Sequence, residues 1–224
     1  SGSFGDHVHH VPIREKDGGT EDYLYVEDVA GILSCVQMGT IEFHIWGSLV
    51  ADLEKPERLI FDLDPDEGLD FGDVKAAAKD IRSMLSDIGL VSFPMLSGGK
   101  GIHVIVPLTP AAEWPQAKDF AHRFAEALAQ AEPDRFVANM AKAKRKGKIF
   151  IDYLRNQRGA TAVVPFSARA REQAPVAVPI RWAELDDFDK ASAFTIRDVK
   201  TLQGRASSKA LRGWGLADQV LPDI

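Results

Sequence analysis

Two aspartates inside an apolar run are the residues of this sequence best suited to chemistry. Asp62 and Asp64 lie in segment 59–65, where the residues before Pro65 are otherwise bulky and apolar. Side chains alternate between the two faces of a strand, so both carboxylates project from one face, about 7 Å apart at their Cα atoms. Burying two like charges this close is costly unless a cation lies between them. Since an all-oxygen ligand set suits Mg²⁺ or Mn²⁺, the pair predicts a divalent-metal site.

The acidic run could also be an Asp-rich turn after a strand or a calcium-binding loop. The plain turn stays open as the structural alternative. A calcium-binding EF-hand loop would begin at Asp62, but it needs glycine at its sixth position and a bidentate glutamate at its twelfth. Those positions hold Glu67 and Asp73. The sequence therefore disfavours the calcium loop.

A glycine-rich turn follows between two expected strands, at 91–96 and 102–108. It reads Ser97-Gly98-Gly99-Lys100-Gly101. Glycines let backbone amides approach a phosphate closely, and Lys100 adds a point charge. The turn is not a Walker A loop, which would open a helix. It therefore predicts either a phosphate-binding turn or a plain hairpin.

Charge is distributed unevenly along the chain. The net charge is -6, yet nine basic residues between positions 141 and 171 face only one acid, Asp152. Local charge governs phosphate binding, so this stretch favours nucleic acid, with a solvated basic face as the alternative. Asp152 itself lies in an apolar segment and is a candidate third acid. The lysines expected to contact DNA phosphates are Lys142, Lys144, Lys146 and Lys148.

The elements that must position these residues alternate between strands and helices. Apolar periodicity predicts helices at 27–38, 70–89 and 114–131, and further strands at 23–26, 41–46, 161–165 and 194–196. The pattern is typical of an α+β domain. We expect a catalytic domain at 21–200, an irregular leader at 1–20 that could include a cloning remnant, and a tail at 201–224. No apolar run is long enough to cross a membrane. Cys35, the single cysteine, points to a reducing cytoplasm.

In combination, the motifs resemble the polymerase domain of bacterial ligase D, in the archaeo-eukaryotic primase superfamily. The resemblance covers about 11–199 and implies a mixed β-sheet core flanked by helices. Its motifs are Ile41-Glu42-x-His44-x-Trp46, Phe61-Asp62-Leu63-Asp64-Pro65, Ser97-Gly98-Gly99-Lys100-Gly101-x-His103-Val104, Lys144-Arg145-x-Gly147-Lys148-x-Phe150-x-Asp152, Arg155-Asn156-x-x-Gly159-x-Thr161 and Pro165-x-Ser167-x-Arg169.

The resemblance implies roles for matching positions. The acids Asp62, Asp64 and Asp152 would carry two catalytic metals, Mn²⁺ or Mg²⁺, which clamp the attacking hydroxyl and the leaving phosphate. His44 would lie in the same pocket. Nucleotide-binding residues would be Ser97, Gly98, Lys100, His103, Arg145 and Arg169. The chain differs from the family pattern in two ways: family members usually carry a longer N-terminal region, and they have glutamine at the position of Arg155.

The leading hypothesis is a metal-dependent nucleotidyltransferase that adds NTPs or dNTPs to a DNA 3′-hydroxyl. The resemblance implies ribonucleotide preference, action on DNA ends or gaps in non-homologous end joining, and partnership with Ku and with ligase and nuclease modules. It also implies a cytoplasmic, nucleoid-associated protein. One alternative is a catalytically weak module that binds DNA ends or nucleotides. Another is a metal-dependent phosphoesterase, which would not need the turn at 97–101.

Overall fold

The computed structural model describes residues 4–15 and 17–222, in two compact units, Ser1–Glu42 and Phe43–Ile224. In the first unit, strands β1 (His9–Arg14) and β2 (Thr20–Tyr25) form an antiparallel pair, and helix α1 covers Val29–Gln37. The Asp28 side chain caps α1 by accepting a hydrogen bond from the Gly31 amide. The expectation of an irregular leader up to residue 20 is therefore wrong for residues 9–14, which form β1. Alternation along β1 buries Ile13, which favours a strand there.

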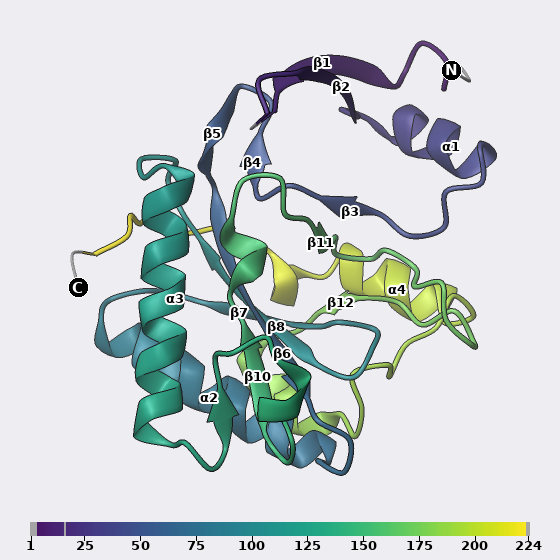
Figure 1. Ribbon diagram of the computed structural model, residues 1–224. Coiled ribbons are helices and arrows are strands. Elements are labelled where there is room, and N and C mark those ends of the chain that lie inside the picture. The colour runs from purple at the N-terminus through teal and green to yellow at the C-terminus, as the bar shows by residue number, and fades with distance from the viewer. Residues whose placement is uncertain (1–3, 16, 223–224) are drawn as a thin grey trace. The chain divides into compact units, whose positions relative to one another are not determined.

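The second unit is built on a mixed, mostly antiparallel sheet (Figure 1). Its strand order is β12-β7-β8-β6-β10-β9, and β9 runs parallel to β10. The strands are β6 (Arg58–Pro65), β7 (Phe93–Leu96), β8 (Ile102–Pro107), β9 (Phe136–Val137), β10 (Ile149–Asp152) and β12 (Val178–Pro179). The α+β class expected from the sequence is confirmed.

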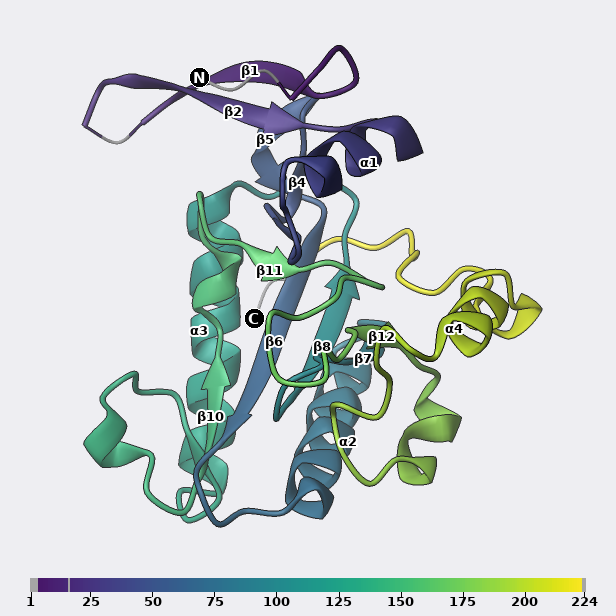
Figure 2. The same cartoon turned by 90° about the vertical axis from the view of Figure 1, so that its right-hand side faces the viewer.

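Helices α2 (Phe71–Asp87) and α3 (Trp114–Ala131) cover one face of this sheet (Figures 1 and 2). Strand β6 alternates, so Leu59, Phe61 and Leu63 are fully buried against the two helices. The Phe61 ring lies 4.9 Å from that of Phe124 on α3. Burying an aromatic or leucine side chain contributes about 1.5–3 kcal/mol, so this face supplies the main packing energy and holds β6 in register.

The opposite face of the sheet carries the alternate residues of the same strands. Ile60, Met95 and Ile105 form a smaller apolar cluster there. The buried Asn156 fixes the backbone of β6, because its side-chain amide accepts from the Ile60 amide and donates to the Ile60 carbonyl. Two short strands, β3 (His44–Ile45) and β11 (Ala162–Val163), pair beside this face. Asp62 and Asp64 lie on this same face further along β6.

The remaining segments differ partly from expectation. The strand expected at 41–46 shortens to β3, because the Phe43 amide bonds the Ser167 hydroxyl instead of a neighbouring strand. Segment 194–196 forms only an isolated bridge, Thr195 with Pro175, among the described residues. Short strands β4 (Ser48–Leu49) and β5 (Asp52–Pro56) pair, and helix α4 spans Val199–Ala206. Within 4–15 and 17–222, the helices all lack the length and apolar character needed to cross a membrane.

Candidate active site

The sheet register brings the acids of two strands together. Asp62 on β6 is the direct antiparallel partner of Asp152 on β10 and of His103 on β8. Asp64 lies two residues beyond Asp62 on the same face. Directly paired residues have Cβ atoms about 4.5–5.5 Å apart, so two carboxylates face each other across the β6–β10 pair. The proposed third acid is therefore next to the first.

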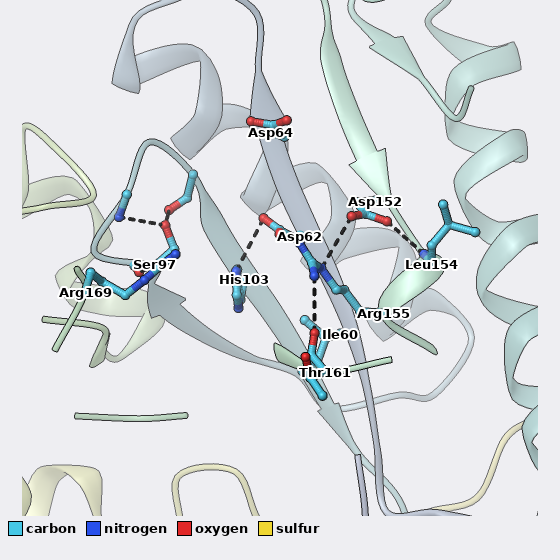
Figure 3. Close-up of polar contacts among 12 residues, drawn as sticks. Ile60, Asp62, Asp64, Ser97, His103, Asp152, Leu154, Arg155, Thr161 and Arg169 are labelled. Carbon is cyan, nitrogen blue, oxygen red and sulfur yellow. Dashed lines mark hydrogen bonds and ion pairs between the residues drawn. The ribbon is translucent and has the colours of Figure 1, made fainter. Parts of the chain in front are cut away.

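A guanidinium group and an imidazole ring contact this group of acids (Figure 3). The Arg155 guanidinium lies 3.5 Å from an Asp62 oxygen and 3.4 Å from an Asp152 oxygen, while donating to the Thr161 carbonyl. His103 Nε2 lies 3.4 Å from Asp62. Like charges across one strand pair repel, and the guanidinium contacts of Arg155 offset this repulsion.

The three acids differ in their electrostatic surroundings. Burial alone would raise the pKa of Asp62, but His103, Arg155 and Arg169 hold it below its ordinary value. Burial and the Asp62 charge raise the pKa of Asp64, against the opposing effect of Arg145, whose guanidinium lies 3.3 Å away.

Burial also raises the pKa of Asp152, against the hydrogen bond from the Leu154 amide, and the Asp62 charge adds to the increase. The surroundings of Asp64 and Asp152 therefore do not fully balance the negative charge of these two carboxylates. Such a site favours an added cation.

The glycine-rich turn lies at the end of β7 beside these acids. The buried Ser97 hydroxyl donates to the Gly101 carbonyl at 2.7 Å and accepts from the Gly99 amide at 3.2 Å. Gly98 has a φ of 69°, in the left-handed region. A Cβ at Gly101 would lie 1.9 Å from the Leu63 carbonyl oxygen, so only glycine lets the turn lie against β6. Arg169 donates to the Ser97 carbonyl and adds charge beside the turn.

A single cavity of about 510 Å³ joins the acids to the turn. Most residues singled out from the sequence line it, and its expected members are His44, Asp62, Asp64, Ser97, Lys100, His103, Arg145, Asp152 and Arg169. Gly98 lies in the turn but not in the lining. The expected DNA-contacting lysines lie outside it, in the turn Lys142–Lys144 and the residues leading to β10. Of segment 142–148, all of which the structure describes, Arg145 lines the cavity and the four lysines do not.

Two arginines of the cavity had no assigned role in the sequence. Arg155 and Arg171 both line it. In the sequence, Arg155 belongs to the basic stretch and to a family motif and departs from the family glutamine, and its position three residues after Asp152 placed it near an acid. Arg171 ends the basic stretch, and only the folding of segment 167–177 back onto the turn brings it to Gly99.

The acids suit a divalent cation by their chemistry, because carboxylate oxygens are the ligands that Mg²⁺ and Mn²⁺ prefer. Within the part of the chain that the structure describes, however, no group of three His, Cys, Asp or Glu side chains is arranged to hold one ion. Guanidinium groups lie close to each carboxylate instead, Arg155 beside Asp62 and Asp152 and Arg145 beside Asp64.

The fold and the cavity define a primase-polymerase type of domain, and comparison with known proteins agrees. The family model described as the LigD primase-polymerase domain matches residues 1–208. The chain therefore belongs to this family, which confirms the resemblance seen in the sequence.

Multifunctional non-homologous end joining protein LigD of Pseudomonas aeruginosa is 42% identical over 183 residues, covering 82% of this chain and 22% of that protein. Bifunctional non-homologous end joining protein LigD of Bacillus subtilis is 31% identical over 182 residues, covering 81% of this chain and 30% of that protein. The chain thus spans less than a third of the length of these relatives.

A solved structure matches as well. The polymerase domain of Mycobacterium tuberculosis ligase D, in complex with DNA, is similar with a TM-score of 0.81 and 32% sequence identity. The match covers 92% of this chain and 74% of that one. The mixed sheet with its flanking helices is therefore the architecture of this family.

Proposed function

We propose that this chain is a metal-dependent nucleotidyltransferase that adds a nucleotide to a DNA 3′-hydroxyl. The observation that carries the proposal is the cavity that joins the Asp62–Asp152 pair to the Ser97–Gly101 turn. A phosphoesterase would need the acids alone. A cavity with acids at one end and Lys100, Arg169 and backbone amides at the other suits a nucleotide triphosphate.

The chemistry of each side chain indicates a separate role. Asp62, Asp64 and Asp152 would hold the divalent ions, which, when bound, activate the hydroxyl and neutralise charge on the phosphates. Lys100 and Arg169 would bind the triphosphate, together with amides of the turn. His103 Nδ1 is buried without a hydrogen-bond partner among the described residues, while Nε2 faces Asp62. The ring is thus oriented by the acid and could bond a ligand group in the cavity.

The exposed lysines of segment 142–148 would hold the DNA backbone. Lys142, Lys144 and Lys146 are solvent-exposed and form no ion pair within the described part of the chain. Such lysines bind phosphates independently of sequence, and their contribution falls as salt rises. We infer that the DNA lies along this segment. Family membership supports further proposals: a role in non-homologous end joining, preference for ribonucleotides with Mn²⁺, and partnership with Ku and with ligase and nuclease modules.

The test is incubation of the chain with gapped DNA, Mn²⁺ and labelled ribonucleotides. We expect extension of the 3′ end, lost on chelation and lost in Asp152→Asn. Binding to the same DNA is measured by fluorescence anisotropy and should persist in the variant, because the lysines remain. DNA binding by the wild-type chain without any extension would instead identify a binding module and refute the enzyme.

A further inference from the structure

A second cleft, of about 380 Å³, lies away from the candidate active site. It is formed where the end of α2 and the start of β7 meet the segment after β12 and the chain around Trp214. Phe93 and Pro94, at the start of β7, line this cleft, whereas Ser97 follows the end of the strand and lines the catalytic cavity. Residues 93 and 97 are about 13 Å apart along an extended strand. A ligand in this cleft therefore would not compete with a nucleotide.

The apolar part of the cleft is aromatic and rigid. The Trp182 indole donates to the Ser92 carbonyl at 2.7 Å. The Trp214 indole lies between the carbonyls of Pro94 and Ile180, at 3.2 and 3.1 Å, and its ring meets Phe93 edge-on. Both indoles are only partly buried. Fixed aromatic rings offer contact area with little loss of conformational entropy, which is the property of binding hot spots.

The polar part of the cleft is positive. Arg82, Arg181 and Arg212 line it, and among the described residues no acidic side chain does. Arg181 is paired with Glu184 at 3.2 Å, and Arg82 lies over the Trp182 ring at 5.1 Å. Neither Arg82 nor Arg212 forms an ion pair in the described chain, and both are exposed. This local excess of positive charge contrasts with the net charge of -6 of the whole chain.

We propose that this cleft binds a short acidic segment of a partner protein, anchored by an aromatic or branched aliphatic side chain. The anchor packs against Trp182 and Trp214, and flanking carboxylates pair with Arg82 and Arg212. Arginine forms bidentate hydrogen bonds with carboxylates, so the rim selects acidic sequences, and the aromatic floor supplies most of the binding energy. The volume lies within the range of specific ligand pockets, about 300–1,000 Å³.

The surroundings favour a peptide over nucleic acid. Asp87 ends α2 beside Ser86 of the lining, and Asp186 and Asp187 follow Trp182 in the next turn, all of them exposed. Asp186 is paired with Lys79 at 2.7 Å and the exposed Lys209 adjoins Ala210 of the lining, so Asp87 and Asp187 are the acids left to repel a polyanion here. A nucleic acid strand, which carries a phosphate at every nucleotide, would meet these acids as it left the cleft. A short segment with two or three carboxylates would not.

The test begins with selection of random ten-residue peptides, displayed on phage, against the whole chain. Selected peptides are synthesised with a fluorescein label, and their affinity is measured by anisotropy. We expect acidic peptides that share one aromatic or branched residue. Their affinity should fall at least tenfold, about 1.4 kcal/mol, in the double variant Arg82→Glu, Arg212→Glu. Both substitutions are at exposed positions, so circular dichroism and thermal unfolding should match those of the wild type.

The matched control is Lys118→Glu, Lys200→Glu, which makes the same change of net charge at exposed positions outside the cleft. It should change the affinity less than twofold. A twelve-nucleotide oligothymidine serves as the competitor and should not displace the peptide. The proposal is overturned if no acidic peptide is enriched, if the arginine variant binds as the wild type does, or if oligothymidine displaces the peptide.

Discussion

Asp62 and Asp152 lie directly opposite each other across the antiparallel strands β6 and β10. This pairing brings two acids that are 90 positions apart in the sequence to one point of the sheet. Arg155 contacts both of them, at 3.5 and 3.4 Å. The site is therefore an ion-paired cluster, and its members should respond differently to substitution.

Asp62→Asn and Asp64→Asn should both abolish nucleotide addition but should affect stability in opposite directions. Asp62 contacts the buried His103 ring and the partly buried Arg155 guanidinium, so its neutralisation weakens both contacts and should cost about 1–3 kcal/mol. Asp64 is half exposed and repelled by Asp62, so its neutralisation should leave stability unchanged or slightly higher. Urea unfolding with a chelator present measures both. Near wild-type extension by either variant would contradict the metal assignment.

Arg155→Gln should strengthen metal binding and weaken the metal-free protein. The arginine competes with a divalent ion for the same carboxylates, so its removal should raise Mn²⁺ affinity about tenfold. Without Arg155 or metal, Asp62 and Asp152 repel each other, so thermal stability with chelator should fall and Mn²⁺ should restore it. Calorimetric titration and thermal unfolding are the measurements. The control is Arg158→Gln, because Arg158 pairs with Glu54 instead. Equal Mn²⁺ affinities of wild type and Arg155→Gln would refute the competition.

Lys100→Ala should weaken nucleotide binding more than DNA binding. Lys100 belongs to the turn at 97–101 and lines the cavity, outside the basic segment 142–148. Losing one charge-assisted phosphate contact costs about 1.5–3 kcal/mol. Nucleotide titration at fixed Mn²⁺ measures the effect, with DNA anisotropy as the second readout and the exposed Lys118→Ala as the control. An unchanged nucleotide dissociation constant would make the turn a plain hairpin.

Glu184→Gln should destabilise the protein in a pH-dependent way. Although burial opposes it, hydrogen bonds from Arg205 and the Arg181 amide lower the pKa of Glu184 from 4.5 to about 2. A carboxyl with a lowered pKa contributes stability above its unfolded value, and this contribution is lost as pH falls through the folded value.

At pH 7 the variant should therefore be less stable by about 1–3 kcal/mol, and the difference should shrink between pH 4.5 and pH 2. Urea unfolding across this range measures it, and Asp186→Asn, at an exposed ion pair, is the control. A difference that stays constant down to pH 2 would show that the glutamate acts through packing alone.

The local elements around the site follow from the amino-acid pattern alone. The apolar stripe of helix 114–131 predicted α3 to the residue, since its spacing matches the helical period and depends on nearby residues only. Alternation along 59–65 placed Asp62 and Asp64 on one face for the same reason. Where the apolar pattern was weak or mixed, the predicted secondary structure was wrong. Segment 194–196 is apolar enough for a strand, but among the described residues it forms a single bridge, Thr195 with Pro175.

Which of these residues meet depends on the tertiary structure. The pairing of β6 with β10 depends on long-range packing against α2 and α3, which no local pattern encodes, and it places Asp152 opposite Asp62. The same packing brings Arg155 between the acids, although its sequence neighbours suggested only a basic stretch. The cleft of Trp182 and Trp214 likewise arises where three distant segments meet. Spacing along the chain determines the face on which a side chain lies, whereas strand order and register determine its partner.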